Sequence, residues 1–469
     1  MSANTLACLQ RISRRCVGAT IPVVLIAVAG SSVVRAAPLD TLQPGQWYEI
    51  PNSNMRAVDP CPTRNCSYSA VSGQYGAMEA WSGGAYDSAR DRLVIWGGGH
   101  QDYAGNEVYV FGPLTSATPT WQRLTQPSSP VQPDVSYYAD GNPSSRHTSN
   151  TLTYAPNIDK FVVLGGGSFY GSGGYGNRAT DMFDFTTNTW SRKATIPGNG
   201  GVLATISAYD AVTGHLWHHS TADGGGLSNY DPIANTYTLY PSAYLSYYYT
   251  MDVDTAGRKL VALGGGNPVL VWDLNNPGAG PTTPVTSGDK TIENAQAPGF
   301  VYDPVSHVFV GWSGGASVYT LNPATWVWSK VSPAASNTVT PTSAEVTGTY
   351  GRFRYIPSMN AFIVVNRTTE NVFIYKLTSG VSTAPSATLT SNASSVAYQG
   401  SLTLTWSSTN TTNCAASDAW SGIKAASGSQ TLTGLTASAT YTLSCSGAGG
   451  SAVRNVSVTV TGAPASSPI

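Results

Sequence analysis

An apolar segment, a short polar turn and a second apolar segment recur six times between residues 84 and 363. In five copies a Tyr precedes an apolar residue by seven positions, and in the fourth copy a Val takes the place of the Tyr. The pairs are Tyr86 and Leu93, Tyr154 and Phe161, Tyr209 and Leu216, Val253 and Leu260, Tyr302 and Phe309, and Tyr355 and Phe362. Two apolar segments joined by Asp, Pro or Gly predict a β-hairpin in each copy.

Glycine follows the second strand of most copies. Triple-glycine runs occupy residues 97–99, 165–167 and 264–266, and a Ser-Gly-Gly run occupies residues 313–315. Glycine permits positive φ angles and close backbone approach where a strand leaves a sheet. A third strand is expected in every copy, and a fourth strand with an aromatic residue in most copies. Repeated four-stranded units predict a β-propeller.

The sixth copy ends at Leu377 without a fourth strand, whereas residues 46–50 form an isolated strand that contains Trp47. We expect residues 46–50 to pair with residues 371–377 and to close the ring. The glycine run that ends strand two and the Trp that opens strand four resemble kelch repeats and the propeller of galactose oxidase, over residues 45–377. The predicted fold of residues 37–377 is therefore an all-β, six-bladed, kelch-type β-propeller closed by an N-terminal strand.

A second domain is expected after the propeller. Residues 378–388 are rich in Ser, Thr, Pro and Gly and predict a linker, and residues 463–469 are expected to be a disordered tail. Between them, residues 389–462 contain short alternating strands. The two cysteines there, with Trp406 and Tyr441, resemble a small immunoglobulin-like β-sandwich, although Cys414 lies beyond the expected strand position.

The N-terminus predicts export. Residues 1–36 contain a positive segment with Arg11, Arg14 and Arg15, an apolar stretch at 21–29 and a small-residue cleavage site at 34–36. Together these features indicate a signal peptide too short to span a bilayer. The four cysteines that lie outside this signal peptide are expected to form two disulfides, Cys61–Cys66 and Cys414–Cys445. We expect a secreted or periplasmic protein that does not insert into membranes.

Charged residues make up only 10% of the chain, and the net charge is −1. The sequence contains no basic run, so nucleic acid is excluded as a partner, because phosphate contacts need clustered cations. A charge-poor, hydroxyl-rich surface suits neutral ligands. We expect an extracellular polysaccharide or glycan as the ligand and a monomeric protein.

In a propeller, the loop between strands two and three and the loop between blades meet on one face, where functional side chains concentrate. Several chemically capable residues fall in these loops. Candidate catalytic residues are His100, His147, Tyr249 and Arg352. Candidate substrate-binding residues are Glu79, Tyr103, Arg146, Asn150, His218, His219 and Tyr248.

Different residues suggest three enzymatic functions, and of these we predict a polysaccharide lyase. The resemblance to galactose oxidase implies a copper enzyme, but its Cys–Tyr cofactor needs a cysteine that the expected disulfides do not leave. A polysaccharide lyase acting on uronic-acid polymers by β-elimination needs a base, an acid and a cation, which His147 or His100, Tyr249, and Arg352 or Arg146 would supply. A glycoside hydrolase needs two carboxylates. Its candidates are Glu79, Asp102, Asp140, Asp223, Glu293 and Glu345.

Non-catalytic alternatives remain beside these hypotheses. One alternative is a non-catalytic carbohydrate- or protein-binding propeller, in which aromatic residues such as Trp81, Tyr103, Tyr175 and Tyr248 would stack on sugars. In another, Arg146 and His147 would serve as structural repeat residues. No cofactor is predicted. A divalent metal held by His100, His147 and either His218 or His219 stays an alternative.

Overall fold

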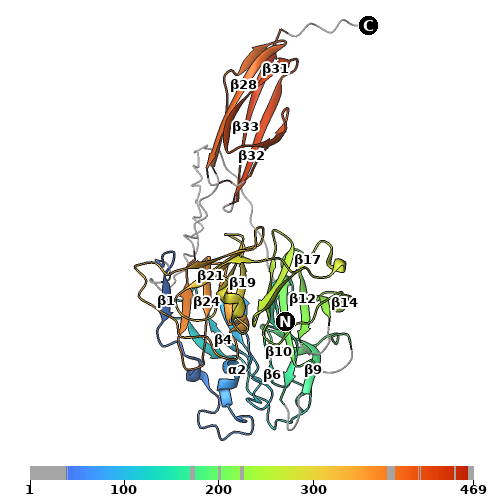
Figure 1. The fold of residues 1–469 in the computed structure, drawn as a ribbon, viewed down its shortest axis with the longest axis vertical. Coiled ribbons are helices and arrows are strands. Elements are labelled where there is room, and N and C mark those ends of the chain that lie inside the picture. The colour runs from blue at the N-terminus through green and yellow to red at the C-terminus, as the bar shows by residue number, and fades with distance from the viewer. Residues whose placement is uncertain are drawn as a thin grey trace, which may run out of the picture.

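The computed structural model describes residue 39 and residues 41–169, 175–198, 202–221, 226–377, 386–409, 411, 413–447 and 450–462. Strands dominate these residues, and they form two separate β-units (Figure 1). The predicted signal peptide (1–36), most of the predicted linker and the predicted tail (463–469) lie outside the described residues. No helix within the described ranges is long and apolar enough to cross a membrane.

The larger unit contains six sheets, in which all strand pairs are antiparallel except that of β18 with β22. The first sheet contains β2 (Ala85–Asp87), β3 (Arg92–Ile95), β4 (Tyr109–Gly112) and β5 (Thr120–Arg123). The second contains β7 (Leu152–Ala155), β8 (Lys160–Ser168), β9 (Tyr175–Asp184) and β10 (Thr189–Arg192), with β6 (Arg146–His147) beside β8. The third contains β11 (Ala204–Asp210), β12 (His215–Thr221), β13 (Leu227–Asp231) and β14 (Thr236–Tyr240).

The other three sheets follow the same order. The fourth sheet contains β15 (Thr250–Asp254), β16 (Lys259–Gly264) and β17 (Asn267–Asp273). The fifth contains β19 (Gly299–Asp303), β20 (Val308–Trp312), β21 (Val318–Asn322) and β22 (Val327–Val331), with β18 (Ser287–Gly288) beside β22. The sixth contains β23 (Phe353–Ile356), β24 (Ala361–Val364), β25 (Val372–Tyr375) and β1 (Trp47–Ile50). Short helices lie in the connections: η1 (Met55–Val58), η2 (Gly73–Tyr75), α2 (Gly76–Glu79), η3 (Pro277–Ala279), η4 (Thr291–Asn294) and η5 (Tyr350–Arg352).

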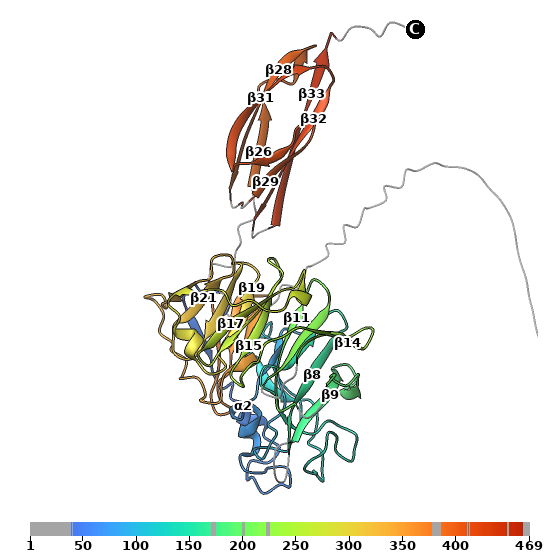
Figure 2. The ribbon, with the colours of Figure 1, turned by 45° about the vertical axis from the view of Figure 1, so that its right-hand side comes forward.

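The first strands of the six sheets lie next to one another. β2 contacts β7, β7 contacts β11, β11 contacts β15, β15 contacts β19, β19 contacts β23, and β23 contacts β2. Figure 2 labels three of these strands, β11, β15 and β19. In the sixth sheet the N-terminal β1 pairs with β25, with Trp47 opposite Tyr375. The strand pairing expected between residues 46–50 and 371–377 is therefore present. The unit is propeller-like and entirely of β type.

The repeated hairpins have a physical explanation. All six apolar residues that follow the Tyr position by seven are fully buried. In the first hairpin the Tyr86 hydroxyl donates a hydrogen bond to Asp91, and Tyr355 donates equivalently to Asn360 in the sixth. Asp91 and Asn360 have φ angles of 54° and 44°. Asp and Asn tolerate this left-handed conformation better than other non-glycine residues, so each Tyr secures the turn residue five positions later.

The smaller unit consists of two sheets. One contains β26 (Ser386–Ser391), β28 (Gly400–Thr409) and β31 (Ser427–Leu435), so the first strand begins inside the predicted linker. The other contains β27 (Ser395–Ala397), β33 (Gly450–Thr461), β32 (Ala439–Gly447), β29 (Asn413–Asp418) and β30 (Gly422–Lys424).

Both predicted disulfides, Cys61–Cys66 and Cys414–Cys445, are present. Cys414 lies directly opposite Cys445 on the neighbouring strands β29 and β32 of one sheet. In antibody domains the disulfide joins the two sheets instead. This difference agrees with the late position of Cys414 in the sequence, and it leaves the immunoglobulin-like assignment a prediction.

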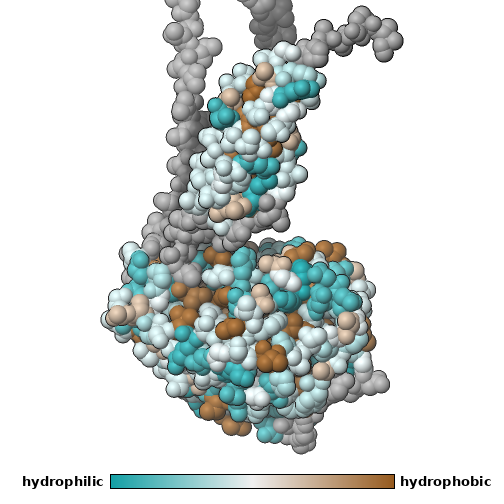
Figure 3. Space-filling model, turned by 45° about the horizontal axis from the view of Figure 1, so that its top comes forward, coloured by the Kyte–Doolittle hydropathy of each residue, from teal (hydrophilic) through white to brown (hydrophobic). Residues whose placement is uncertain are grey.

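The surface is mixed in polarity. Figure 3 shows one face of the molecule, on which apolar side chains are scattered among polar ones rather than gathered in a single patch.

Candidate ligand-binding pocket

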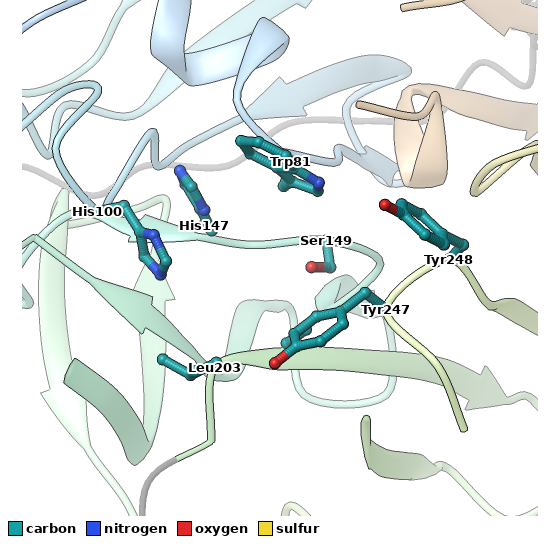
Figure 4. A pocket seen from close by; sticks show the side chains of 8 residues that line it. Trp81, His100, His147, Ser149, Leu203, Tyr247 and Tyr248 are labelled. Atoms are coloured by element: carbon teal, nitrogen blue, oxygen red, sulfur yellow. The ribbon is translucent and has the colours of Figure 1, made fainter. Parts of the chain in front are cut away.

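A pocket of about 270 Å³ lies where the chain enters the first strands of several sheets. We call it the entry pocket. Its lining residues are Trp81, His100, His147, Ser149, Leu203, Ala204, Tyr247 and Tyr248. Figure 4 shows His100 and His147 side by side, with Tyr247 and Tyr248 across the opening from them. The structure thus brings together three of the predicted site residues, His100, His147 and Tyr248.

The two imidazoles form a stacked pair that is held by a carboxylate. The ring centroids of His100 and His147 lie 4.1 Å apart, with 19° between the ring planes. His147 Nε2 lies 2.9 Å from Asp102 Oδ2, and Ser72 Oγ donates to Asp102 Oδ1 at 3.1 Å. The Trp81 ring lies 5.2 Å from that of His147. The hydrogen bond with Asp102 therefore fixes the orientation of the His147 ring, which packs against the rings of His100 and Trp81.

The glycine run at residues 97–99 explains how His100 reaches His147. A Cβ atom on Gly99 would lie 2.1 Å from the backbone nitrogen of His147, so only glycine lets the two chain segments approach this closely. His100 follows directly, and its Nε2 lies above Gly167 of the next glycine run, where a Cβ atom would approach it to 2.5 Å. The two glycine runs thus position the histidine pair.

Both imidazoles are neutral at neutral pH. Burial, and to a lesser extent the nearby His147, lowers the pKa of His100 to about 4. Burial also lowers the pKa of His147, against the opposing effect of Asp102. For Asp102, burial raises the pKa, but the hydrogen bonds from His147 and Ser72 hold it below its usual value. Because an ionised carboxylate only accepts hydrogen bonds, His147 Nε2 carries the proton shared with Asp102.

Three lining residues have strained backbones. The φ angles of Trp81, His100 and Ser149 are 44°, 47° and 45°. Such angles cost a non-glycine residue about 1–3 kcal/mol and persist where the surrounding structure enforces them, often at functional sites. A backbone hydrogen bond from Ser149 to the carbonyl oxygen of Trp81 joins two of these positions. Local strain therefore marks the entry pocket as a candidate functional site.

A second cavity, of about 330 Å³, adjoins the first. We call it the side pocket. Trp81 lines both cavities, and the side pocket also contains Glu79 and Asp102. Burial, followed by the nearby Glu345, raises the pKa of Glu79. Glu79 thus belongs to this site, as the sequence analysis proposed, but to the side pocket.

Two predicted catalytic residues do not line either pocket. The Tyr249 hydroxyl donates to the carbonyl oxygen of Pro268, at 2.7 Å. Arg352 is fully buried. Its guanidinium donates to the carbonyl oxygens of Met78, Ser82, Gly348 and Val365. Both side chains are thus engaged with carbonyl oxygens of the fold, and their roles as acid and cation stay predictions without support from the two cavities.

Most predicted binding residues also have structural roles. Arg146 is fully buried in an ion pair with Asp181, as the structural alternative anticipated. The other buried residues use their side chains inside the fold: Tyr103 donates to Glu107, Asn150 to the carbonyl oxygens of Ser207 and Met251, and His218 and His219 contact Ser228 and Ser242. Polarity alone did not distinguish these residues from ligand contacts.

Other lining residues escaped the sequence analysis. Ser149, Leu203 and Ala204 lie in or beside connections that differ from one repeat to the next, and no periodic signal marks them. Within the described ranges, no three His, Cys, Asp or Glu side chains are grouped so that they could hold a metal ion.

The fold and the pocket define a propeller-like all-β protein with one aromatic, imidazole-lined site. No family model and no curated protein matches the chain. Among solved structures, it is similar to an auxiliary nutrient binding protein from Bacteroides thetaiotaomicron (12% identity, 64% of this chain and 69% of that chain, TM-score 0.41). It is also similar to a fungal alcohol oxidase of the AA5 family in complex with copper (13%, 81% and 85%, TM-score 0.40) and to a B. thetaiotaomicron protein of unknown function (11%, 70% and 75%, TM-score 0.43).

Proposed function

We propose that the larger unit is a closed six-bladed propeller that binds a neutral glycan in the entry pocket. The cyclic contacts of the first strands and the pairing of β1 with β25 support the closed ring. We further propose that the protein is exported and acts as a monomer outside the cytoplasm. Two disulfides, which persist in oxidising compartments, support that location.

The chemistry of the lining favours a sugar. Trp81, Tyr247 and Tyr248 offer ring faces to the apolar face of a pyranose, while imidazole, hydroxyl and phenol groups can hydrogen-bond its hydroxyls. None of the residues that line the entry pocket is Asp, Glu, Lys or Arg, and both histidines are neutral. An uncharged lining favours a neutral ligand, because a charged one would lose hydration without gaining a partner.

The position of Trp81 between two cavities is the observation that most strongly supports glycan binding. Its side chain, 37% exposed, lines both the entry pocket and the side pocket. One sugar unit on each side of the indole would contact the same residue. We therefore propose an oligosaccharide of two or more units as the ligand.

Trp81→Gly tests this proposal. We expect at least a tenfold loss of affinity for a bound oligosaccharide. The free energy of unfolding should change by no more than about 1 kcal/mol, because lost packing is offset by relief of the positive φ angle. Calorimetric titration with a panel of neutral oligosaccharides and urea denaturation measure the two effects.

Tyr244→Ala is the matched control, since Tyr244 is 71% exposed and lies outside both linings. It should retain wild-type affinity. Wild-type affinity in Trp81→Gly, or equal losses in both variants, would contradict the proposed site.

Glycoside hydrolysis is a second candidate, favoured by two carboxyl groups on one cavity. Glu79 and Asp102 both line the side pocket, and their pKa values are shifted in opposite directions. A protonated Glu79 would donate its proton to the glycosidic oxygen as the C–O bond breaks, and ionised Asp102 would stabilise the positive anomeric carbon until water adds.

Glu79→Gln distinguishes hydrolysis from binding. If the protein is a hydrolase, we expect new reducing ends from a bound oligosaccharide and at least a hundredfold slower release by the variant, with binding retained. Absence of reducing ends with wild-type protein and a sugar that binds would reject hydrolysis and leave the binding proposal intact.

The lyase hypothesis receives less support. β-Elimination on a uronate needs a cation beside the carboxylate, and the predicted cations Arg352 and Arg146 are engaged with buried partners. His100 and His147 line the entry pocket as candidate bases, but the lining offers no arginine or lysine to accompany them.

A further inference from the structure

A third cavity, of about 210 Å³, lies at the other end of the first strands. We call it the turn pocket. Most residues that line the entry pocket precede or begin β2, β7, β11 or β15, and His100 lies in the connection after β3. The turn pocket is lined instead by residues within or just after the six first strands, including β19 and β23. The two linings share no residue.

One position of the repeat defines the turn pocket. The residue immediately before the repeated Tyr, or before Val253 in the fourth copy, lines the cavity in all six sheets. These residues are Ala85, Thr153, Ala208, Asp252, Val301 and Arg354. Four of them are small or apolar, and two have opposite charges. The cavity therefore lies among all six first strands and has one acidic and one basic wall.

The two charged groups are deep and not paired with each other. Burial raises the pKa of Asp252 and lowers that of Arg354. Asp252 Oδ2 accepts a hydrogen bond from the backbone N–H of Tyr302, at 2.8 Å. Within the described part of the chain, no ion pair of 4.0 Å or less joins Asp252 to Arg354. Each charge favours the ionised form of the other from a longer distance. Contact with an oppositely charged group in the cavity is therefore still possible for both.

Arg354 is held in place from one side only. Its Nε and Nη2 atoms donate to the carbonyl oxygens of Gly84, Gly351 and Leu152, which belong to different parts of the ring. Among the hydrogen bonds between described residues, none uses Arg354 Nη1 or Asp252 Oδ1. A guanidinium anchored by carbonyls, with one free NH₂ group, is pre-organised to bind a carboxylate.

Aromatic side walls complete the cavity. Tyr86, Tyr154, Tyr209 and Tyr355 line it. The hydroxyls of Tyr86, Tyr154 and Tyr355 are bound to turn residues, which fixes the rings. Fixed tyrosine rings attract cations to their faces. The volume is below the roughly 300–1,000 Å³ of drug-sized sites and suits a small molecule.

We propose that the turn pocket binds a small zwitterion of amino-acid size, with its carboxylate on Arg354 and its ammonium group on Asp252 among the tyrosine rings. A neutral sugar could hydrogen-bond both walls but would bring no opposite charge into contact with either of them. This site is independent of the glycan site.

Calorimetric titration of the intact protein tests the proposal, with glycine, alanine and serine as probes. Acetate and ethylamine, which carry one charge each, and glucose serve as comparisons. We expect at least one amino acid to bind and the three comparison molecules to bind at least tenfold more weakly. No binding by any amino acid at millimolar concentration, or equal binding of glucose, would overturn the proposal.

Two variants locate the binding. Asp252→Asn should weaken amino-acid binding at least tenfold. Ser88→Trp, at an exposed position on the rim, should obstruct entry without removing either charge. Retained affinity for an oligosaccharide would establish that each variant is folded. Wild-type amino-acid affinity in both variants would show that the zwitterion binds elsewhere and would refute the assignment.

Discussion

Acidification from pH 7 to pH 4 is expected to lower the free energy of unfolding by several kcal/mol. Burial lowers the pKa of His218 to about 3 and that of His219 to about 4, and burial with the nearby His147 lowers that of His100 to about 4. An unfolded histidine has a pKa of about 6.5. Between these values the unfolded chain binds more protons than the folded one, so stability falls as the pH falls and levels off below about pH 3.

His218 should contribute most to this acid sensitivity. It is fully buried, and its Nε2 atom has no hydrogen-bond partner among the described residues, so protonation there would leave an unpaired charge. One pKa unit corresponds to about 1.4 kcal/mol, which makes the contribution of His218 on the order of 3 kcal/mol. His218→Leu removes the titrating group at similar volume and should flatten the dependence of stability on pH.

Urea denaturation followed by tryptophan fluorescence at pH 7, 5.5 and 4 measures the effect. His215→Leu is the control, because the His215 side chain is 33% exposed at the start of β12. It should keep a pH dependence closer to that of the wild type. An unchanged pH dependence in His218→Leu would mean that His218 does not cause the acid sensitivity.

Arg352→Met is expected to lower the free energy of unfolding by about 3–5 kcal/mol, because buried carbonyl oxygens would lose their partner. Three of them belong to Met78 and Ser82, beside the first sheet, and to Gly348, before the sixth. The guanidinium therefore joins segments 270 residues apart. Ser82 directly follows Trp81, so we also expect weaker glycan binding.

Thermal and urea denaturation of Arg352→Met would measure this loss. Arg192→Met is the matched control, since Arg192 is exposed and contacts the face of Tyr137. Its cost should stay below about 1 kcal/mol. A loss of similar size in both variants would show that the buried carbonyl contacts of Arg352 are not what stabilises the fold.

Local chemistry made much of the fold predictable. The Tyr-to-apolar spacing of seven reflects a hairpin whose turn and buried position lie within a dozen residues, as in residues 84–95. The short loop between Cys61 and Cys66 made that disulfide predictable for the same reason. The immunoglobulin-like assignment stays a prediction, because the sheet that holds Cys414 depends on pairings distant in sequence.

The candidate site was predictable only in part. The glycine runs indicated where His100 would lie. The expectation that functional side chains gather in the loops of one face also selected Arg352, Tyr249 and His218. A side chain that binds a ligand and one that binds a buried carbonyl share the same chemistry. Only the contacts with distant segments separate them.

The sequence by itself determined the repeated hairpins, the buried apolar position of each and the cysteine pairs, since these depend on periodicity and short-range geometry. The tertiary structure alone decided which polar groups meet an open cavity. In the folded protein the His100 ring stacks on that of His147, and the Arg352 guanidinium donates to backbone carbonyl oxygens. Asp252 and Arg354 line the same cavity. Those outcomes depend on how six sheets pack around common cavities, and no local pattern encodes that packing.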